Sequence, residues 1–162
     1  LSSAFYRNAS RSAVQGAFPV RIAERQEIMP DSSSLMQSMK RVDYLWPSSD
    51  ECSVTWQQLA KELISHPKVL AIVHRRADAR ELAELLRTEA PEERVFHLSA
   101  LMCAAHRSDV LRDVDSALRG GDTCRVVSTQ LVEAGVDIDF PVVYRALGGL
   151  ESIVQAAGRC NR

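Results

Sequence analysis

Between residue 54 and the end of the chain, short apolar runs alternate with longer segments in which apolar residues recur every three to four positions. The run at 69–73 is continuously apolar, which is typical of a strand buried on both faces of a parallel sheet. The recurrence at three to four positions is typical of a helix with one buried face. The pattern predicts strands at 69–73, 94–98, 124–128 and 142–146, and helices that carry Trp56, Ala79, Val110 and Glu151.

The ends of these helices carry recognisable signals. Ser53 is the predicted N-cap of the first helix, which ends before His66-Pro67. Gly120-Gly121 ends the third helix, because glycine is the residue that most readily adopts the left-handed conformation after a helix. The fourth helix is expected to extend from Glu151 to Arg159.

The alternation of strands and helices predicts an α/β domain with a parallel sheet that is flanked by helices on both faces. In such sheets the functional groups collect in the loops that follow the carboxyl ends of the strands. The loops after Val73, Leu98 and Ser128 are therefore the expected locations of a site. His97, inside a strand, is interpreted as a core histidine with a hydrogen-bond partner.

The first part of the chain is weakly patterned, with serine clusters and scattered prolines. Only residues 40–46 alternate polar and apolar side chains, which predicts one half-buried strand that ends at Pro47. We therefore expect a linker or irregular region at 1–55 and one domain at 56–162. Because the chain lacks an initiator methionine and ends within a pattern, the domain is expected to be truncated at its C-terminus.

Composition narrows the class of protein. The 162 residues include 20 basic and 21 acidic side chains, so any contact with nucleic acid must be a local patch. The four cysteines lie far apart without metal-ligand spacing, which indicates reduced thiols and no metal site. No apolar run approaches the roughly 20 residues of a membrane span, and no signal peptide is visible. A cytoplasmic protein without membrane contact is expected.

Four segments in order resemble the motifs of a known motor domain. Three of them begin within the first, second and third predicted core strands, and the fourth begins within the last predicted helix. They read VLAIVHRRADAREL, HLSALMCAAHR, STQLVEAGVDID and QAAGRCNR. These segments resemble the fourth to sixth motifs of superfamily 2 helicases. The resemblance covers about 69–162 and implies a RecA-like fold, as the second motor domain.

The segments LSALMCAAHR and STQLVEAGVDIDFPVVYRALGGLESIVQAAGRCNR are similar in more detail to the CRISPR-associated helicase-nuclease of type I systems. This resemblance implies an enzyme that uses ATP and Mg²⁺ to unwind and degrade foreign DNA. Its expected partners are the first RecA-like domain of the same protein, single-stranded DNA and an RNA-guided surveillance complex. The isolated chain is expected to be inactive.

The resemblance implies that Arg159 and Arg162 act as arginine fingers on the γ-phosphate of ATP. Three residues apart in a predicted helix, they would share one face with Gln155, which would orient water or phosphate. Arginine suits this task because its planar fork stays charged and binds phosphate in two places. The alternative interpretation of the arginine pair is a solvated helix face.

Further candidates lie in the other motif segments. Thr129 follows a buried strand directly, where its hydroxyl and nearby backbone N–H groups could grip a DNA phosphate or cap a helix. Gly135 permits close approach of the backbone to a nucleotide, and Asp137 is placed by the resemblance at the ribose. The remaining candidates are Gly158 for the nucleotide and Ser128, His74 and Arg75 for DNA.

The missing motifs define what a partner domain must supply. The sequence contains no G-x-x-x-x-G-K-[ST] phosphate loop and no His-Asp dipeptide of a nuclease. The acidic run at 50–53 follows a turn and not a buried strand, so it is rejected as a magnesium motif. The phosphate loop and the metal ligands are therefore expected outside this chain. Two alternatives stay open: a RecA-like interaction module without ATP chemistry, and the motor of another superfamily 2 helicase.

Overall fold

A computed structural model of the chain describes residues 31, 34, 37, 38, 40–46, 54–133 and 137–160. The chain divides into two compact units, Leu1–Asp43 and Tyr44–Arg162. In the first unit, Lys40 and Asp43 form an exposed ion pair. The second unit contains the sheet and its helices, whereas the predicted boundary at 55/56 stays a prediction.

The prediction of a strand at 40–46 is wrong. These residues have no regular secondary structure, and all but one of them are exposed. Leu45 is 96% exposed and Trp46 59%, while the rings of Tyr44 and Trp46 stack at 6.3 Å. An isolated strand leaves its backbone N–H and C=O groups without partners. Among the described strands, none pairs with this segment, so its alternating pattern does not lead to a strand.

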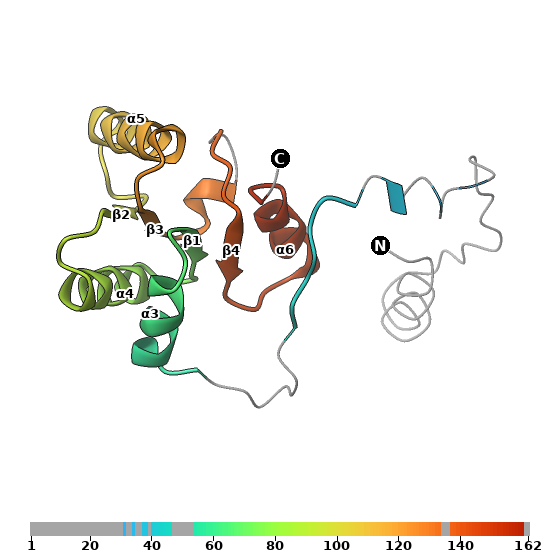
Figure 1. The fold of residues 1–162 in the computed structure, drawn as a ribbon, viewed down its shortest axis with the longest axis horizontal. Helices are drawn as coiled ribbons and strands as arrows, with labels where there is room; N and C mark the ends of the chain where they lie inside the picture. The colour runs from blue at the N-terminus through green and yellow to red at the C-terminus, as the bar shows by residue number, and fades with distance from the viewer. Residues whose placement is uncertain are drawn as a thin grey trace, which may run out of the picture. The chain divides into compact units, whose positions relative to one another are not determined.

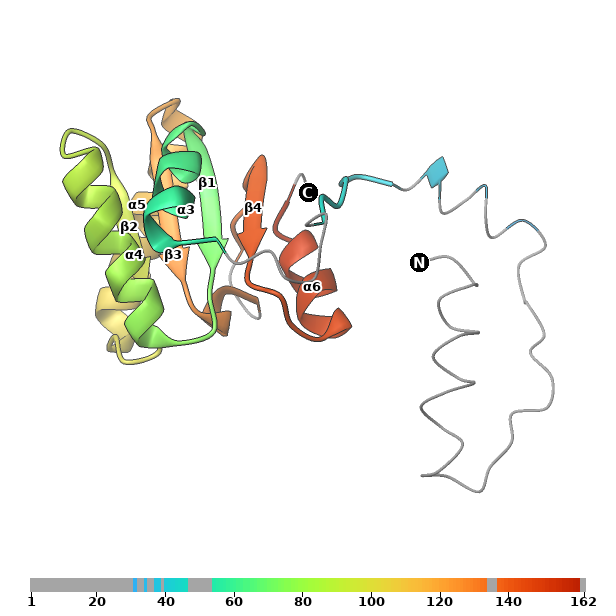
Figure 2. The ribbon, with the colours of Figure 1, turned by 90° about the horizontal axis from the view of Figure 1, so that it is seen from below.

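The described sheet has four strands, and every pairing is parallel. The strands are β1 (Lys68–Ile72), β2 (Val95–Leu98), β3 (Cys124–Ser128) and β4 (Val142–Arg145), in the order β2-β3-β1-β4. This arrangement confirms the predicted parallel α/β sheet and all four core strands. Figure 2 shows β4 beside β1, with α6 next to β4.

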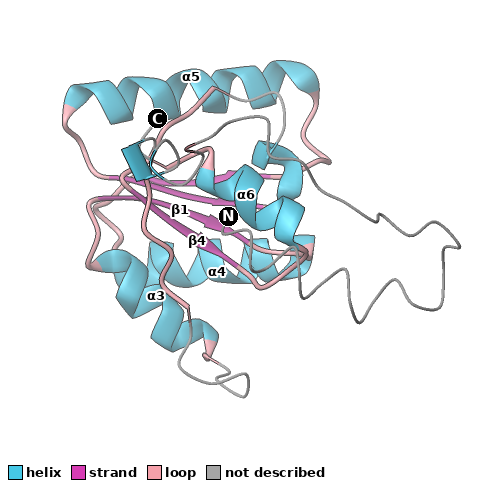
Figure 3. Ribbon diagram, turned by 90° about the vertical axis from the view of Figure 1, so that its right-hand side faces the viewer, coloured by secondary structure: helices cyan, strands magenta, loops and turns pink. Residues whose placement is uncertain are grey.

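Helices cover both faces of the sheet, as predicted. The helices α3 (Trp56–Ile64) and α4 (Arg76–Glu89) lie on one face, and α5 (Ala104–Gly120) lies on the other (Figures 1 and 3). The short 3-10 helix η1 (Gln130–Glu133) follows β3, and α6 (Leu150–Ala157) follows β4. None of the helices that the structure describes has the length and apolar character needed to cross a membrane.

The two faces of β1 account for its continuous apolar run. Val69, Ala71 and Val73 join the cluster beneath α3 and α4, whereas Leu70 and Ile72 join the cluster beneath α5 and α6. Alternate side chains of a strand point to opposite faces, so a strand covered on both sides needs apolar residues at every position. The sequence interpretation of 69–73 as a doubly buried strand is confirmed.

The N-cap of helix α3 lies two residues after the predicted N-cap. Thr55 is the N-cap, and it forms a capping box with Gln58 in which each side chain accepts a hydrogen bond from the other residue's backbone. Ser53 lies outside the described residues. The reciprocal pairing satisfies two N–H groups that the helix cannot satisfy itself, which explains why the helix starts there.

The end of α3 is tied to the sheet by a buried arginine. Arg125 on β3 is 2% exposed and donates hydrogen bonds to the carbonyl oxygens of Leu63 (3.2 Å) and Ile64 (2.6 Å). Its guanidinium also forms an ion pair with Glu93. Burial lowers the pKa of Arg125. These contacts satisfy carbonyls at the C-terminus of α3 that have no partner inside the helix.

Two of the three described cysteines differ sharply in exposure, which gives a direct test of the fold. Cys124 is fully buried on β3, and burial raises its pKa to about 11, whereas Cys103 is exposed. The thiolate is the reactive form, so we expect iodoacetamide at pH 8 to label Cys103 at least about 100-fold faster than Cys124. Mass spectrometry of peptides sampled over time measures both rates; similar rates under native conditions would contradict the buried position of β3.

Candidate functional site

The loops after three strands meet at the carboxyl edge of the sheet. The Val73 N–H donates to the Ser128 carbonyl oxygen at 2.9 Å, and the Ala146 N–H donates to the Ile72 carbonyl oxygen at 2.9 Å. The exits of β1, β3 and β4 therefore lie side by side. This edge brings the exit of β1 beside that of β3, more than 50 residues away in the sequence, and with them the predicted site residues His74, Arg75, Ser128 and Thr129.

Ser128 and Thr129 are both withdrawn from solvent at this edge. Ser128 is fully buried, and its Oγ lies 2.9 Å from the Thr129 carbonyl oxygen and 3.3 Å from that of Leu98. Thr129 is 8% exposed and directly precedes η1. The Ser128 hydroxyl therefore holds β3 to β2, while the small exposed part of Thr129 faces the edge.

The nucleotide candidates of the fifth motif are only partly described. Gly135 lies outside the described residues. Asp137 is exposed and precedes the buried side chains of Ile138 and Phe140, which anchor the segment in the core beneath α5. An exposed carboxylate on an anchored segment is compatible with a ribose contact, and the role predicted for Asp137 stays a prediction.

The helix predicted at 151–159 is shorter than expected. Helix α6 ends at Ala157, Gly158 is its C-cap, and Arg159 lies in the following turn. The physical reason is a parallel bridge between Phe140 and Cys160, in which the Phe140 N–H donates to the Arg159 carbonyl oxygen at 2.9 Å. The prediction that Gln155 and Arg159 share one face of a continuous helix is therefore wrong, and Arg162 lies outside the described residues.

Arg159 joins the sixth-motif segment to the fifth. Its Nε donates to the carbonyl oxygen of Val132 in η1 at 3.0 Å, and the side chain is partly buried. The buried Val132 and Ala156 belong to the same core cluster, so both ends of this contact rest on packed side chains. An arginine has five N–H donors in a rigid fork, so one guanidinium can hold a carbonyl and a phosphate together. Gln155 donates to Glu151 within α6 at 3.3 Å.

His74 and Arg75 follow β1 and have different partners. His74 Nε2 lies 2.7 Å from the Leu147 carbonyl oxygen, in the loop between β4 and α6. Arg75 forms a two-pronged ion pair with Asp78 at 2.8 and 3.0 Å, and the Asp78 carboxylate raises the pKa of Arg75. Arg75 is 78% exposed, so its charge reaches solvent at the start of α4.

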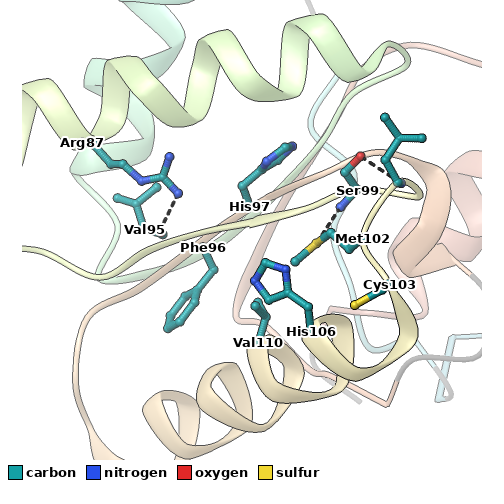
Figure 4. Close-up of a pocket in the computed structure, with 10 residues that line it drawn as sticks. Arg87, Val95, Phe96, His97, Ser99, Met102, Cys103, His106 and Val110 are labelled. Carbon is teal, nitrogen blue, oxygen red and sulfur yellow. Dashed lines mark hydrogen bonds between the residues drawn. The ribbon is translucent and has the colours of Figure 1, made fainter.

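A hollow of about 560 Å³ lies at the other end of the strand order, along β2 and the start of α5 (Figure 4). It is lined by His97, whose buried Nε2 has no hydrogen-bond partner among the described residues. The interpretation of His97 as a core histidine with a hydrogen-bond partner is therefore wrong for this nitrogen. Burial, together with the charges of Arg87 and Arg80, lowers the pKa of His97. The neutral ring is the form that this environment favours.

The described residues place the Arg159 guanidinium, which by its chemistry can bind phosphate, against η1, the short helix that follows β3. Within the described ranges, no group of three or more His, Cys, Asp or Glu side chains could hold a metal ion. The sequence contains no G-x-x-x-x-G-K-[ST] phosphate loop.

Two groups of the candidate site were not predicted from the sequence. The first is the carbonyl of Val132, which receives the Arg159 hydrogen bond; no side-chain pattern marks a backbone acceptor. The second is the loop before α6, where His74 approaches Leu147 and Gly148. The pair Gly148-Gly149 was a usable signal, because consecutive glycines after a strand mark a close approach of the backbone.

Comparison with known proteins gives consistent matches. The family model described as "CRISPR-associated nuclease/helicase Cas3, C-terminal" matches residues 65–162. A CRISPR-associated nuclease/helicase Cas3 from Haloferax volcanii is 48% identical over 54 residues, which are 33% of this chain and 6% of that protein. The chain thus spans a small fraction of the length of this relative.

Solved structures match the fold. The T. fusca Cas3-ATP structure has a TM-score of 0.55 and 24% identity, and the match covers 69% of this chain and 14% of that one. The helicase MrfA bound to DNA and AMPPNP has a TM-score of 0.54 and 24% identity, over 72% of this chain and 17% of that one. A chain of a CRISPR RNA-guided surveillance complex has a TM-score of 0.54 and 26% identity, and the match covers 64% of this chain and 14% of that one.

Proposed function

Because the chain belongs to the family of Cas3 C-terminal regions, we propose that it is the second motor domain of an ATP-dependent DNA helicase that degrades foreign DNA. In this proposal the phosphate loop and the metal ligands come from a first RecA-like domain of the same protein. The arginines of this chain, together with the loops at the carboxyl ends of its strands, are proposed to form one wall of the nucleotide site and one side of a DNA groove.

The observation that carries the proposal is the position of Arg159 at the joint between the fifth-motif and sixth-motif segments. Bound ATP supplies the phosphoanhydride that is hydrolysed. When the two domains close, the guanidinium of Arg159 would approach the γ-phosphate and stabilise the charge on its equatorial oxygens. Arg162 is proposed as the second finger and Gln155 as the residue that orients water. Gly135, Asp137 and Gly158 are proposed to line the nucleotide.

The same edge offers contacts to single-stranded DNA. Ser128 is the last residue of β3 and Thr129 follows it, while His74 and Arg75 follow β1, whose exit lies beside that of β3. Arg75 contributes an exposed positive charge, and Thr129 contributes a hydroxyl near the start of η1. Phosphate contacts from such groups position a strand without reading its sequence. Because these loops and Arg159 share one edge, binding of DNA can affect the position of the arginine.

The wider role follows from the relatives. Nucleotide-bound structures of T. fusca Cas3 support ATP as a cofactor, and the surveillance-complex match supports an RNA-guided complex as the recruiting partner. Mg²⁺ is proposed as the accompanying metal because the resemblance to helicases implies it. A cytoplasmic location agrees with this proposal. The alternative is that the chain is the motor of another superfamily 2 helicase. The match to the helicase MrfA favours this alternative, because its TM-score of 0.54 is close to the 0.55 of T. fusca Cas3-ATP.

The test is ATP hydrolysis by the intact parent protein, with and without single-stranded DNA. We expect Thr129→Ala to reduce the DNA-stimulated rate about tenfold or more and to change the basal rate much less, because the hydroxyl is proposed to contact DNA only. Thr129→Ser keeps the hydroxyl and is the matched control. An equal effect of Thr129→Ala on both rates would remove Thr129 from the DNA groove, and absence of any hydrolysis by the parent would favour an interaction module.

A further inference from the structure

We propose that His74 is a positioning residue that holds the N-terminal end of α6 against the exit of β1, and thereby sets the position of Gln155 on that helix. This inference rests on the proposed function, since it concerns the same nucleotide site. It assigns His74 a role distinct from the DNA contact expected of it. The contact that carries it is the 2.7 Å approach of His74 Nε2 to the Leu147 carbonyl oxygen, 73 residues away in sequence.

The geometry determines which ring nitrogen carries the proton. A carbonyl oxygen can only accept, so His74 Nε2 must be protonated and donate. The neutral Nε2–H tautomer and the doubly protonated ring can both make this bond. The hydrogen bond therefore does not require a change in the charge of His74, and Nδ1 stays on the side of the ring away from Leu147.

Helix α6 is held unequally at its two ends. At its C-terminal end, Arg159 Nε bonds to Val132, the Phe140 N–H bonds to Arg159, and Ala156 is buried in the core. At its N-terminal end, the N-cap Gly149 provides no side-chain hydrogen bond, and Leu147 is 60% exposed. Glycines at 148 and 149 leave the backbone of this loop permissive. The bond from His74 therefore supplies a tertiary restraint where local structure supplies little.

Gly148 gives this contact a steric signature. A Cβ atom added at Gly148 would lie 3.3 Å from His74 Cε1, a separation at which the ring must shift by a few tenths of an ångström. A Cβ atom added at the neighbouring Gly149 would meet nothing within 4 Å. Gly148→Ala and Gly149→Ala are therefore chemically identical changes, one residue apart, of which only the first disturbs His74.

The restraint matters because Gln155 lies on α6, whose N-terminal end is held by His74 and whose C-terminal end is held next to Arg159. If the N-terminal end of α6 is released, the helix can pivot about its fixed C-terminal end, and Gln155 loses a single defined position while Arg159 stays at the fixed end. Misplacement of a catalytic group by about 1 Å can cost roughly 100-fold in rate. Partial loss of the restraint should therefore lower the turnover number more than it lowers nucleotide affinity.

The first measurement uses this chain alone and does not depend on ATP chemistry. We expect long-range ¹H–¹⁵N spectra to show His74 protonated at Nε2. We also expect His74→Ala to increase amide hydrogen exchange about tenfold in the first turn of α6, including the Ile153 N–H that bonds to Gly149. His74→Ala with unchanged exchange, or a His74 ring protonated only at Nδ1, would overturn the proposal.

The second measurement is DNA-stimulated ATP hydrolysis by the intact parent. We expect His74→Ala and Gly148→Ala each to lower kcat about three- to tenfold with KM for ATP little changed, and Gly149→Ala to have no effect. In the His74→Ala background, Gly148→Ala should add nothing, because the two changes act through one contact. Additive effects would overturn the positioning role. A parent without ATP hydrolysis would contradict the proposed function and leave the exchange result standing.

Discussion

Arg159→Ala in the intact parent protein is expected to lower DNA-stimulated ATP hydrolysis about 10³-fold or more, while ATP binding stays nearly unchanged. Arginine fingers contribute roughly 10³–10⁵ in rate, because the guanidinium meets charge that develops only in the transition state. Steady-state hydrolysis and equilibrium binding of a fluorescent ATP analogue measure the two quantities separately. Arg159→Lys should recover little, since lysine keeps the charge and loses the planar fork.

The contact of Arg159 with Val132 requires a control for structure. Removal of the side chain also removes the 3.0 Å bond from Nε to the Val132 carbonyl oxygen. Arg112→Ala is the matched control, because Arg112 is a 73% exposed arginine on α5 that pairs with Asp109. Thermal unfolding of all variants shows how much of any loss is structural. Equal losses of ATP binding and turnover would contradict the finger role and assign Arg159 to ground-state binding.

Arg125→Met is expected to reduce the free energy of unfolding by about 3 kcal/mol, which corresponds to a fall in Tm of roughly 6–12 °C. The substitution removes the guanidinium donors from the carbonyl oxygens of Leu63 and Ile64, of which Leu63 keeps the His66 N–H, and it leaves Glu93 without its counter-ion. A buried polar group that loses its hydrogen-bond partner costs free energy, because its desolvation is no longer compensated. Urea and thermal unfolding of this chain measure the change.

Arg119→Met is the matched control for this substitution. Arg119 is 80% exposed on α5 and pairs with Asp115 at 3.0 Å, so its loss should cost less than about 0.5 kcal/mol. A double-mutant cycle with Glu93→Gln separates the ion pair from the carbonyl contacts. If Arg125→Met and Arg119→Met lowered the free energy of unfolding equally little, the contacts of Arg125 would not stabilise the packing of α3 on the sheet.

Local patterns were sufficient for the core elements. The run at 69–73, the helical spacing from Trp56 to Ile64 and the glycines after α5 all predicted their elements within a few residues. In each case the side chains that determine the element lie within it or directly beside it. Gly121 has φ of 81°, the left-handed conformation for which glycine is suited. Such positions carry their structural reason in their own chemistry.

The errors have a common physical origin. The alternation at 40–46 matches a strand, yet a strand exists only where a neighbour accepts its hydrogen bonds. The last helix was predicted to extend to Arg159, yet it ends at Ala157 before the bridge between Phe140 and Cys160. Both outcomes depend on partners distant in sequence, which no local pattern can reveal.

The sequence alone determined the kind of domain and the identity of its motif segments, because apolar periodicity and short motifs are local properties of the chain. The tertiary structure decided which backbone groups those segments meet. It placed Arg159 on Val132, His74 on Leu147 and Arg125 on the end of α3. These contacts join a side chain to a carbonyl oxygen that every residue possesses, so only the path of the folded chain could select the partner.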